Sequence, residues 1–233
     1  MSSFSLKIVA AVTMVIDHIG LFFFPQFYGM RIVGRLSFPI FSWLIATGAL
    51  HTKNIWHYTT RLFGLAVVSQ IPYYFAYQKL GQPFKLNVVF SLALSILVIA
   101  LLKRLNNFSY KVLVIFLGLV MAHFLKFDFG VGGVLSTLTF WLFYKRPTLL
   151  IISQILIFGL PMFFYSLMFY PRTFWQIMVD YTYFAPFALF ALPFIFLFNG
   201  REGPKLKYAF YAFYPLQYIT IYFVQLITGN IIE

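Results

Sequence analysis

The stretch that decides the fold is KIVAAVTMVIDHIGLFFFPQFYGMRIVGR, residues 7–35. Its first part is long and apolar enough to cross a bilayer, yet Asp17 and His18 stand next to each other well inside the apolar run. Arg31 and Arg35 follow just beyond it. A charged side chain at the centre of a membrane helix costs about 2.5–3.5 kcal/mol on insertion scales, and such residues mark functional sites by default. We therefore expect the chemistry of the protein here.

Composition predicts an integral membrane protein. The 233 residues are 62% hydrophobic and only 9% charged, whereas a soluble domain has about 25% charged residues. The absence of cysteine excludes disulfides and thiolate metal sites. The net charge of +12 fits cationic loops that face anionic lipid better than a nucleic-acid partner. No small-residue cleavage site follows the first apolar run, so we interpret it as a retained span.

Nine apolar runs are expected to cross the membrane, because about 30 Å of hydrocarbon needs about 20 helical residues. The sequence therefore predicts one all-α polytopic membrane domain over residues 1–233, with about nine transmembrane helices. Residues 109–144 are either two short spans or one re-entrant pair. The predicted spans lie at roughly residues 6–24, 32–50, 59–77, 86–102, 109–125, 130–144, 148–167, 184–199 and 207–228.

The distribution of basic residues predicts the orientation. Eleven of the 17 lysines and arginines fall on the same side of the membrane as the N-terminus, and six on the other. Cytoplasmic loops carry the excess of Lys and Arg. The N-terminus is therefore expected in the cytoplasm and, with nine spans, the C-terminus outside.

One face of the first span carries a lysine and a histidine that could take part in a reaction. Lys7, Ala11, Met14 and His18 recur at helical spacing and share one side of the helix. Lys7 and His18 are about 16 Å apart along the axis, at about 1.5 Å per residue. Asp17 lies about 100° around the helix from His18, so we expect it to pair with a cation from another element.

Arg31 and Arg35 are the nearest such cations, and they share a helix face because they are four residues apart. Three interpretations are open. One of the arginines forms a structural ion pair with Asp17, or both extend to the membrane interface, or they form a rigid fork for a phosphate or carboxylate. The small residues that follow, such as Gly34 and Ser42, are better explained by close helix packing.

A second basic group lies on the predicted cytoplasmic side. The loop HTKNIWHYTTR carries Lys53 and Arg61. These cations either set the topology or form a rim for a polyanionic ligand. A metal site from His51 and His57 is disfavoured, since no acidic or thiol ligand is near in sequence, and no metal is expected. The other cations on this side are Lys103, Arg104, Arg201, Lys205 and Lys207.

Several strings, taken together, resemble the TraX family, membrane proteins named for the conjugation factor that acetylates the N-terminus of pilin. The resemblance covers almost the whole chain in order. The matching strings are LKIVAAVTMVIDHIG, RIVGRLSFPIFSWLIATGALHT, SQIPYYFAY, LNVVFSLAL, FDFGVGGVL and KLKYAFYAFYPLQYITIYF.

The resemblance implies an activity. The family looks related to multi-pass acyltransferases that pass an acyl group from cytoplasmic coenzyme A to an acceptor across the membrane. In the O-acyltransferases among them, ten residues separate a basic residue from a catalytic histidine in the first span. Lys7 and His18 reproduce that spacing, with a lysine where arginine is usual. The family's terminal motif often reads YPLH, whereas this chain has Gln217 at the last position, so a catalytic role is not carried over to Gln217.

The sequence is thus interpreted as a multi-pass acetyltransferase of a bacterial cytoplasmic membrane, with acetyl-CoA as acyl donor. The acceptor is an amine or hydroxyl of a protein N-terminus, glycan or lipid near the outer face. His18 is the predicted general base, since an imidazole with an ordinary pKa of about 6.5 suits that role, and Asp17 orients the site or balances an arginine. The cations expected to hold coenzyme A phosphates are Lys7, Arg31, Arg35, Lys53, Arg61 and Lys205.

Two other function classes remain open at this point. A transporter or channel for an anionic metabolite would use the same intramembrane charges along its path. A structural partner of a conjugation or secretion machine would need no catalytic residue. Binding of coenzyme A separates the acetyltransferase from both.

Overall fold

Side-chain caps set where several helices begin. In the computed structural model, which describes residues 1–81, 83–168, 181–204 and 206–229, Ser2 precedes the first helix and its hydroxyl accepts a hydrogen bond from the backbone N–H of Ser5 at 3.1 Å. Asn54, Asn87 and Asn107 precede three later helices in the same way. Each cap satisfies a backbone N–H that the helix itself leaves without a partner.

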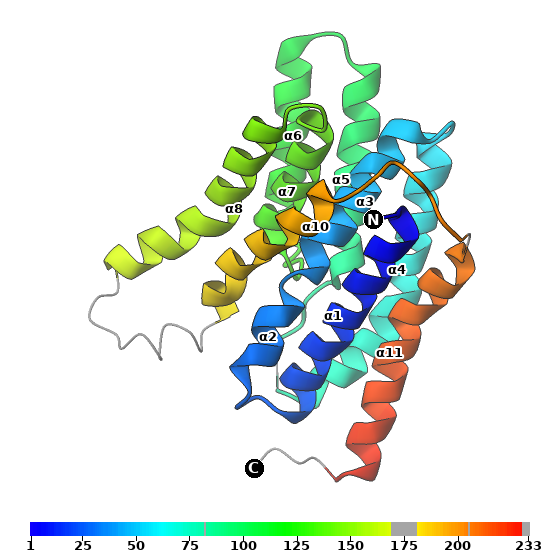
Figure 1. The fold of residues 1–233 in the computed structure, drawn as a ribbon, viewed down its shortest axis with the longest axis vertical. Helices are drawn as coiled ribbons and strands as arrows, with labels where there is room; N and C mark the ends of the chain where they lie inside the picture. The colour runs from blue at the N-terminus through cyan, green and yellow to red at the C-terminus, as the bar shows by residue number, and fades with distance from the viewer. Residues whose placement is uncertain (82, 169–180, 205, 230–233) are drawn as a thin grey trace. The chain divides into compact units, whose positions relative to one another are not determined.

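The described chain is helical and contains no named strand, which confirms the predicted all-α fold (Figure 1). Leu86 and Phe127 form an isolated β-bridge. The elements are α1 (Ser3–Phe23), α2 (Tyr28–Gly34), α3 (Ser37–His51), α4 (Ile55–Gln78), α5 (Val88–Arg104), α6 (Phe108–Phe124), α7 (Gly130–Leu142), α8 (Pro147–Met168), the 3₁₀ helix η1 (Tyr181–Ala191), α10 (Leu192–Phe196) and α11 (Lys207–Ile227).

Each predicted span coincides with one helix or with two successive ones. The run at 32–50 is interrupted between α2 and α3, and the run at 184–199 starts in η1 and continues as α10. Residues 109–144 form two separate helices, α6 and α7. Within the described residues, two stretches, Ser3–Phe23 and Tyr28–His51, are long and apolar enough to cross a membrane by length and composition.

The chain divides into two compact units, which are described separately. The first comprises Met1–Leu44 and Thr139–Lys205, and the second Ile45–Leu138 and Leu206–Glu233. In the first unit α2 packs on α1 and on η1, and α8 packs on η1. A short segment after α10 crosses the start of α1, where the N–H groups of Ser3 and Phe4 donate to the carbonyls of Arg201 and Glu202 at 2.8 and 3.0 Å.

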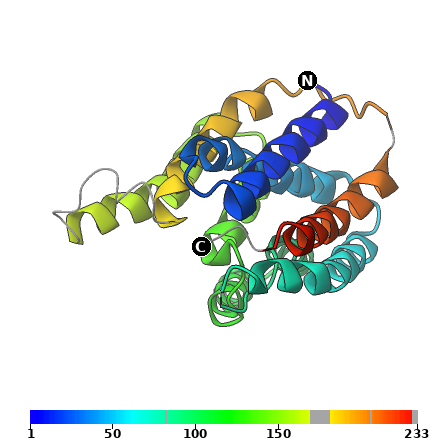
Figure 2. The same ribbon diagram turned by 90° about the horizontal axis from the view of Figure 1, so that it is seen from below.

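The second unit is built on α4 and α5. The helix α5 packs against α4 and α6, and α11 packs on α4; α4 and α11 lie side by side in both views (Figure 1, Figure 2). Ala93, Ile96 and Ile99 of α5 are completely buried. A Cβ on Gly118 of α6 would be 2.7 Å from a methyl carbon of Val98, so the absence of a side chain there lets α6 approach α5.

Candidate active site

The candidate site lies where α2 folds back against α1 in the first unit. Two glycines allow the close approach of these helices. A Cβ on Gly20 would be 2.7 Å from the Cβ of Met30, and a Cβ on Gly34 would overlap the side chain of Asp17. The small residue that the sequence assigned to packing at position 34 therefore provides the space in which the Asp17 carboxylate lies.

Asp17 pairs with both arginines of the motif. The Nη1 of Arg31 is 2.9 Å from Oδ2 of Asp17, and the Nη2 of Arg35 donates to both carboxylate oxygens at 2.9 Å. All three residues are buried, with 9, 6 and 5% of their surface exposed for Asp17, Arg31 and Arg35. The predicted partnership of Asp17 with these cations is confirmed, and it includes both of them.

Backbone carbonyls fix the two guanidinium groups further. The Nη1 of Arg31 also donates to the carbonyl of Asp17 at 3.2 Å, and the Nε of Arg35 donates to the carbonyl of Arg31 at 3.3 Å. Charged hydrogen bonds of this kind are about twice as strong as neutral ones. The cluster therefore locks α2 onto α1 at the level of Asp17.

His18 follows Asp17 in α1 and is also buried, with 6% of its surface exposed. Its ring lies edge-on to that of Phe22, with centroids 6.1 Å apart. Ala11 and Met14, which share its helix face, are buried too, each with 8% exposed. The face that the sequence singled out is thus turned into the protein.

Lys7 lies on the same helix at its N-terminal end. It is half-buried and interacts electrostatically with Glu202, a residue of the segment that crosses the start of α1. Sequence reasoning did not pair these two residues. Positions 7 and 202 are far apart in the sequence, and no motif indicates that the segment after α10 returns to the first helix.

The other predicted cations fall elsewhere. Lys53 is exposed and Arg61 is half-buried, and both belong to the second unit. The guanidinium of Arg61 lies over the ring of Tyr58, 5.7 Å from its centroid. Lys205 lies outside the described residues. The structure therefore gathers Lys7, Asp17, His18, Arg31 and Arg35 in one unit, while Lys53 and Arg61 stand in the other.

The geometry defines what this site offers chemically. A buried imidazole follows directly after a carboxylate that two guanidinium groups hold in place. An imidazole can accept and return a proton near neutral pH, and fixed cations stabilise negative charge that develops on an oxygen. Within the described residues, no group of three or more His, Cys, Asp or Glu side chains is placed to hold a metal ion.

Comparison with known proteins finds similarity over most of the chain. A family model described as TraX protein matches residues 2–225. The chain is 29% identical over 233 residues, covering 92% of each protein, to the probable fimbrial assembly protein FimC, serogroup H1, of Dichelobacter nodosus. It is 50% identical over 36 residues, 16% of this chain and 14% of the other, to the uncharacterized protein RP591 of Rickettsia prowazekii (strain Madrid E). No solved structure matches.

Proposed function

Because the chain belongs to the TraX family, whose model matches residues 2–225, we propose that it is a membrane-embedded acetyltransferase. It moves an acetyl group from cytoplasmic acetyl-CoA to an amine or hydroxyl acceptor at or near the outer face of the membrane. One observation carries the proposal, namely a buried histidine beside a carboxylate locked by two arginines, inside an apolar helix. The resemblance to a fimbrial assembly protein supports an acceptor on a pilus subunit, such as a pilin N-terminus.

The proposed topology is polytopic, with nine spans, a cytoplasmic N-terminus and an outer C-terminus. Three observations support it: the helices follow the predicted spans, 62% of the residues are hydrophobic, and Lys and Arg are more numerous on the side of the N-terminus. The protein is then a multi-pass protein of the bacterial cytoplasmic membrane.

In the proposed reaction His18 is the general base. The acceptor's N or O attacks the carbonyl carbon of the thioester while His18 takes the proton of the attacking group. The C–S bond then breaks, the acetyl group stays on the acceptor, and the thiolate that leaves takes a proton from His18. A positioned base of this kind contributes about 10²–10⁴ in rate.

Asp17 is a positioning residue in this scheme. Its carboxylate accepts hydrogen bonds from Arg35 and pairs with Arg31, which fixes the helix turn that carries His18. Two guanidinium groups against one carboxylate give this cluster of described residues a net positive charge. That field favours the negative charge that develops on the thioester oxygen during attack.

Two other classes of function compete with this proposal. A transporter of an anionic metabolite would also place an acid, a histidine and arginines inside an apolar helix. A structural role in pilus assembly would match the name of the Dichelobacter nodosus relative. Neither predicts specific binding of coenzyme A thioesters.

The deciding experiment measures acetyl-CoA binding and acetyl transfer with the full chain purified in detergent. We expect saturable binding of acetyl-CoA, and transfer of labelled acetyl to a peptide that carries a free N-terminus or to a hydroxyl acceptor. His51→Gln is a matched control for His18→Gln, because His51 is an exposed histidine of the second unit. Absence of acetyl-CoA binding in monodisperse protein would contradict the proposal.

A further inference from the structure

In the second unit, an arginine at the end of α5 is held against a tryptophan at the start of α4. The guanidinium carbon of Arg104 lies 4.7 Å from the centre of the Trp56 ring. Lys103 fixes the end of α5 further, because its ammonium donates to the carbonyl of Ala49 in α3. Arg104 is exposed and forms no side-chain hydrogen bond with the described residues. Its position is therefore set while its donors stay available.

The charge around this contact is positive and is not offset by acids. Residues 45–127 contain no Asp or Glu. Lys53 precedes Trp56 by three residues and is exposed. In the part of the chain that the structure describes, no carboxylate lies at ion-pair distance from Lys53 or Arg104. The surface formed by Lys53, Trp56 and Arg104, named here the Arg104 surface, therefore attracts anions.

An exposed apolar stripe runs along α4 from this surface. Val67 follows Trp56 by 11 residues, which places it about 20° away around the helix, and Ile71 lies one turn further on. These two side chains have 58 and 64% of their surface exposed. Thr60 and Gly64, which lie between Trp56 and Val67, are exposed too, and a Cβ on Gly64 would meet nothing within 4 Å. The stripe is therefore open along its length.

The length of the stripe matches one leaflet of a bilayer. Trp56 and Ile71 are 15 residues apart, which is about 22 Å along the helix axis. Half of a bilayer is also about 20–22 Å thick, of which about 15 Å is hydrocarbon. Tryptophan is enriched at the interface between these layers. A lipid whose acyl chain lies along Val67 and Ile71 thus brings its phosphate to the level of Trp56 and Arg104.

We infer that the Arg104 surface binds an anionic phospholipid, with the phosphate on Arg104 and an acyl chain along the exposed stripe of α4. A guanidinium binds a phosphate through two parallel N–H donors. The headgroup of phosphatidylglycerol keeps its negative charge, whereas the choline of phosphatidylcholine cancels it and is repelled by Lys53. A soluble phosphate would satisfy Arg104 but would leave the stripe uncovered, so the stripe favours a lipid.

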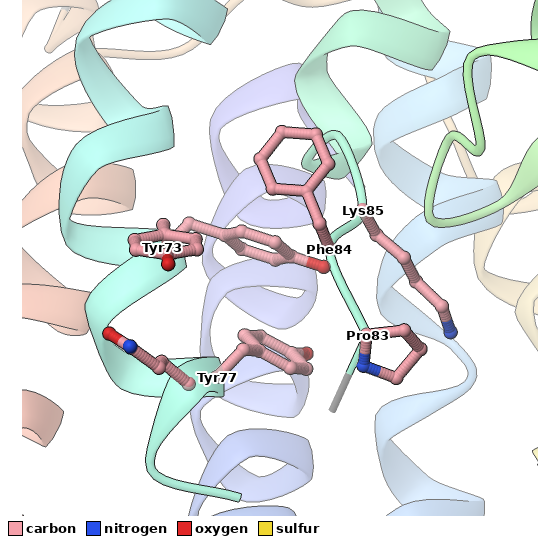
Figure 3. Close-up of a pocket in the computed structure, with 7 residues that line it drawn as sticks. Tyr73, Tyr77, Pro83, Phe84 and Lys85 are labelled. Carbon is pink, nitrogen blue, oxygen red and sulfur yellow. The ribbon is translucent and has the colours of Figure 1, made fainter. Parts of the chain in front are cut away.

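The opposite end of α4 does not combine these features. Tyr73 and Tyr77 line a pocket of about 170 Å³ there, beside the turn that leads to α5 (Figure 3). An acidic residue is close to this turn, since the N–H of Asp128 donates to the carbonyl of Leu86 at 2.9 Å. Lys79, which follows α4 at this end, is exposed. It is therefore a matched control for the removal of a cation at the other end of the helix.

The test measures lipid binding to the full chain by native mass spectrometry from detergent. Phosphatidylglycerol and phosphatidylcholine with the same acyl chains are titrated, and we expect phosphatidylglycerol to bind at least about fivefold more tightly. Arg104→Gln should lower its affinity by about fivefold, the share of one basic residue at an anionic surface. Trp56→Leu should lower it too, because Arg104 loses the ring that orients it. Lys79→Gln should leave it unchanged.

Two competitors decide between a lipid and a soluble phosphate. Neither glycerol 3-phosphate, which lacks acyl chains, nor acetyl-CoA should displace phosphatidylglycerol at an equal concentration. Displacement by glycerol 3-phosphate would overturn the inference in favour of a soluble phosphate, and displacement by acetyl-CoA would assign these cations to the acyl donor. Equal binding of the two lipids, or equal affinity of wild type and monodisperse Arg104→Gln for phosphatidylglycerol, would also overturn it.

The inference rests on the proposed membrane topology, which places the start of α4 at the cytoplasmic interface, and not on acetyl transfer. The Arg104 surface and His18 belong to different units. Failure of the two proposals is therefore distinguishable: protein that binds phosphatidylglycerol through Arg104 but does not bind acetyl-CoA would contradict the acetyltransferase alone.

Discussion

Gly34 lies against Asp17 so closely that any Cβ at position 34 would overlap the Cβ, Cγ and Oδ1 of the aspartate. The contact joins α2 to α1 at the level of the buried ion cluster. It explains why a glycine precedes Arg35, the residue that donates to both carboxylate oxygens.

The first prediction follows from this contact. Gly34→Ala should displace the Asp17 carboxylate from its arginines, because the new methyl group needs the same space. Overpacking of a tight interior costs about 1–3 kcal/mol, and loss of the ion pair adds to that cost. Thermal unfolding in detergent measures the effect. Gly29→Ala in the same helix is the control, since a Cβ there meets nothing within 4 Å; equal melting temperatures for both variants would contradict the prediction.

The second prediction concerns the ion cluster itself. Asp17→Asn leaves two buried guanidinium groups without their carboxylate, and breaking a buried pair costs about 3–5 kcal/mol. Thermal stability should therefore fall sharply. Adding Arg35→Gln to Asp17→Asn should restore part of the loss, and more of it than Arg31→Gln does, because Arg35 bonds to both carboxylate oxygens. Strictly additive effects in both double variants would show that no coupling exists.

The third prediction separates catalysis from folding. His18→Ala and His18→Gln should lower the rate of acetyl transfer by about 10²–10⁴. The purified variants should stay monodisperse, with a melting temperature near that of wild type. His51→Gln should keep full activity. Turnover at the wild-type rate by either His18 variant would remove His18 from the mechanism.

The fourth prediction tests the donor side of the site. Lys7→Ala should weaken acetyl-CoA binding and leave acceptor affinity nearly unchanged, because a lysine holds phosphate as a point charge. The wild-type affinity should fall with added salt more steeply than that of Lys7→Ala, since the variant lacks one charge that attracts the phosphates. Isothermal titration at two salt concentrations gives both quantities.

Removal of the Glu202 charge should change acetyl-CoA affinity in the opposite direction. It interacts electrostatically with Lys7 and therefore offsets part of the lysine's attraction for phosphate. Glu202→Gln should strengthen acetyl-CoA binding through the remaining Lys7 charge, and should have no effect in the Lys7→Ala background. Normal donor affinity with lost acceptor binding in Lys7→Ala would reverse the proposed direction of transfer.

The sequence predicted where the helices lie, because each predicted apolar run coincides with one helix or with two successive ones. It also predicted the partnership of Asp17 with the arginines, because buried charges need opposite charges and the candidates were few. It did not predict the interruption between α2 and α3 at Arg35. A hydropathy window averages over such a break, and the hydrogen bonds of Arg35 to the carboxylate and to the Arg31 carbonyl are visible only in three dimensions.

Other parts of the sites depend on contacts between distant segments. The approach of Glu202 to Lys7 arises from backbone hydrogen bonds that bring the segment after α10 across the start of α1. The turn before α5 is attached to α4 through the hydrogen bond from the side chain of Gln70 to the carbonyl of Lys85. Neither arrangement has a periodic pattern in the sequence, so residue spacing could not reveal it. The roles of His18 and of the predicted phosphate-binding cations remain predictions.

The pairing of Asp17 with residues that lie 14 and 18 positions later in the chain has a consequence for biogenesis. When α1 alone has emerged from the ribosome, its aspartate has no cation within reach, and insertion of that helix carries a penalty of about 2.5–3.5 kcal/mol. The penalty is relieved only when Arg31 and Arg35 have also emerged and can fold back. The first two helices should therefore enter the bilayer together as a hairpin. A nascent chain stalled with α1 outside the ribosome and both arginines still inside it should remain extractable by alkali, whereas a longer chain that exposes both arginines should not.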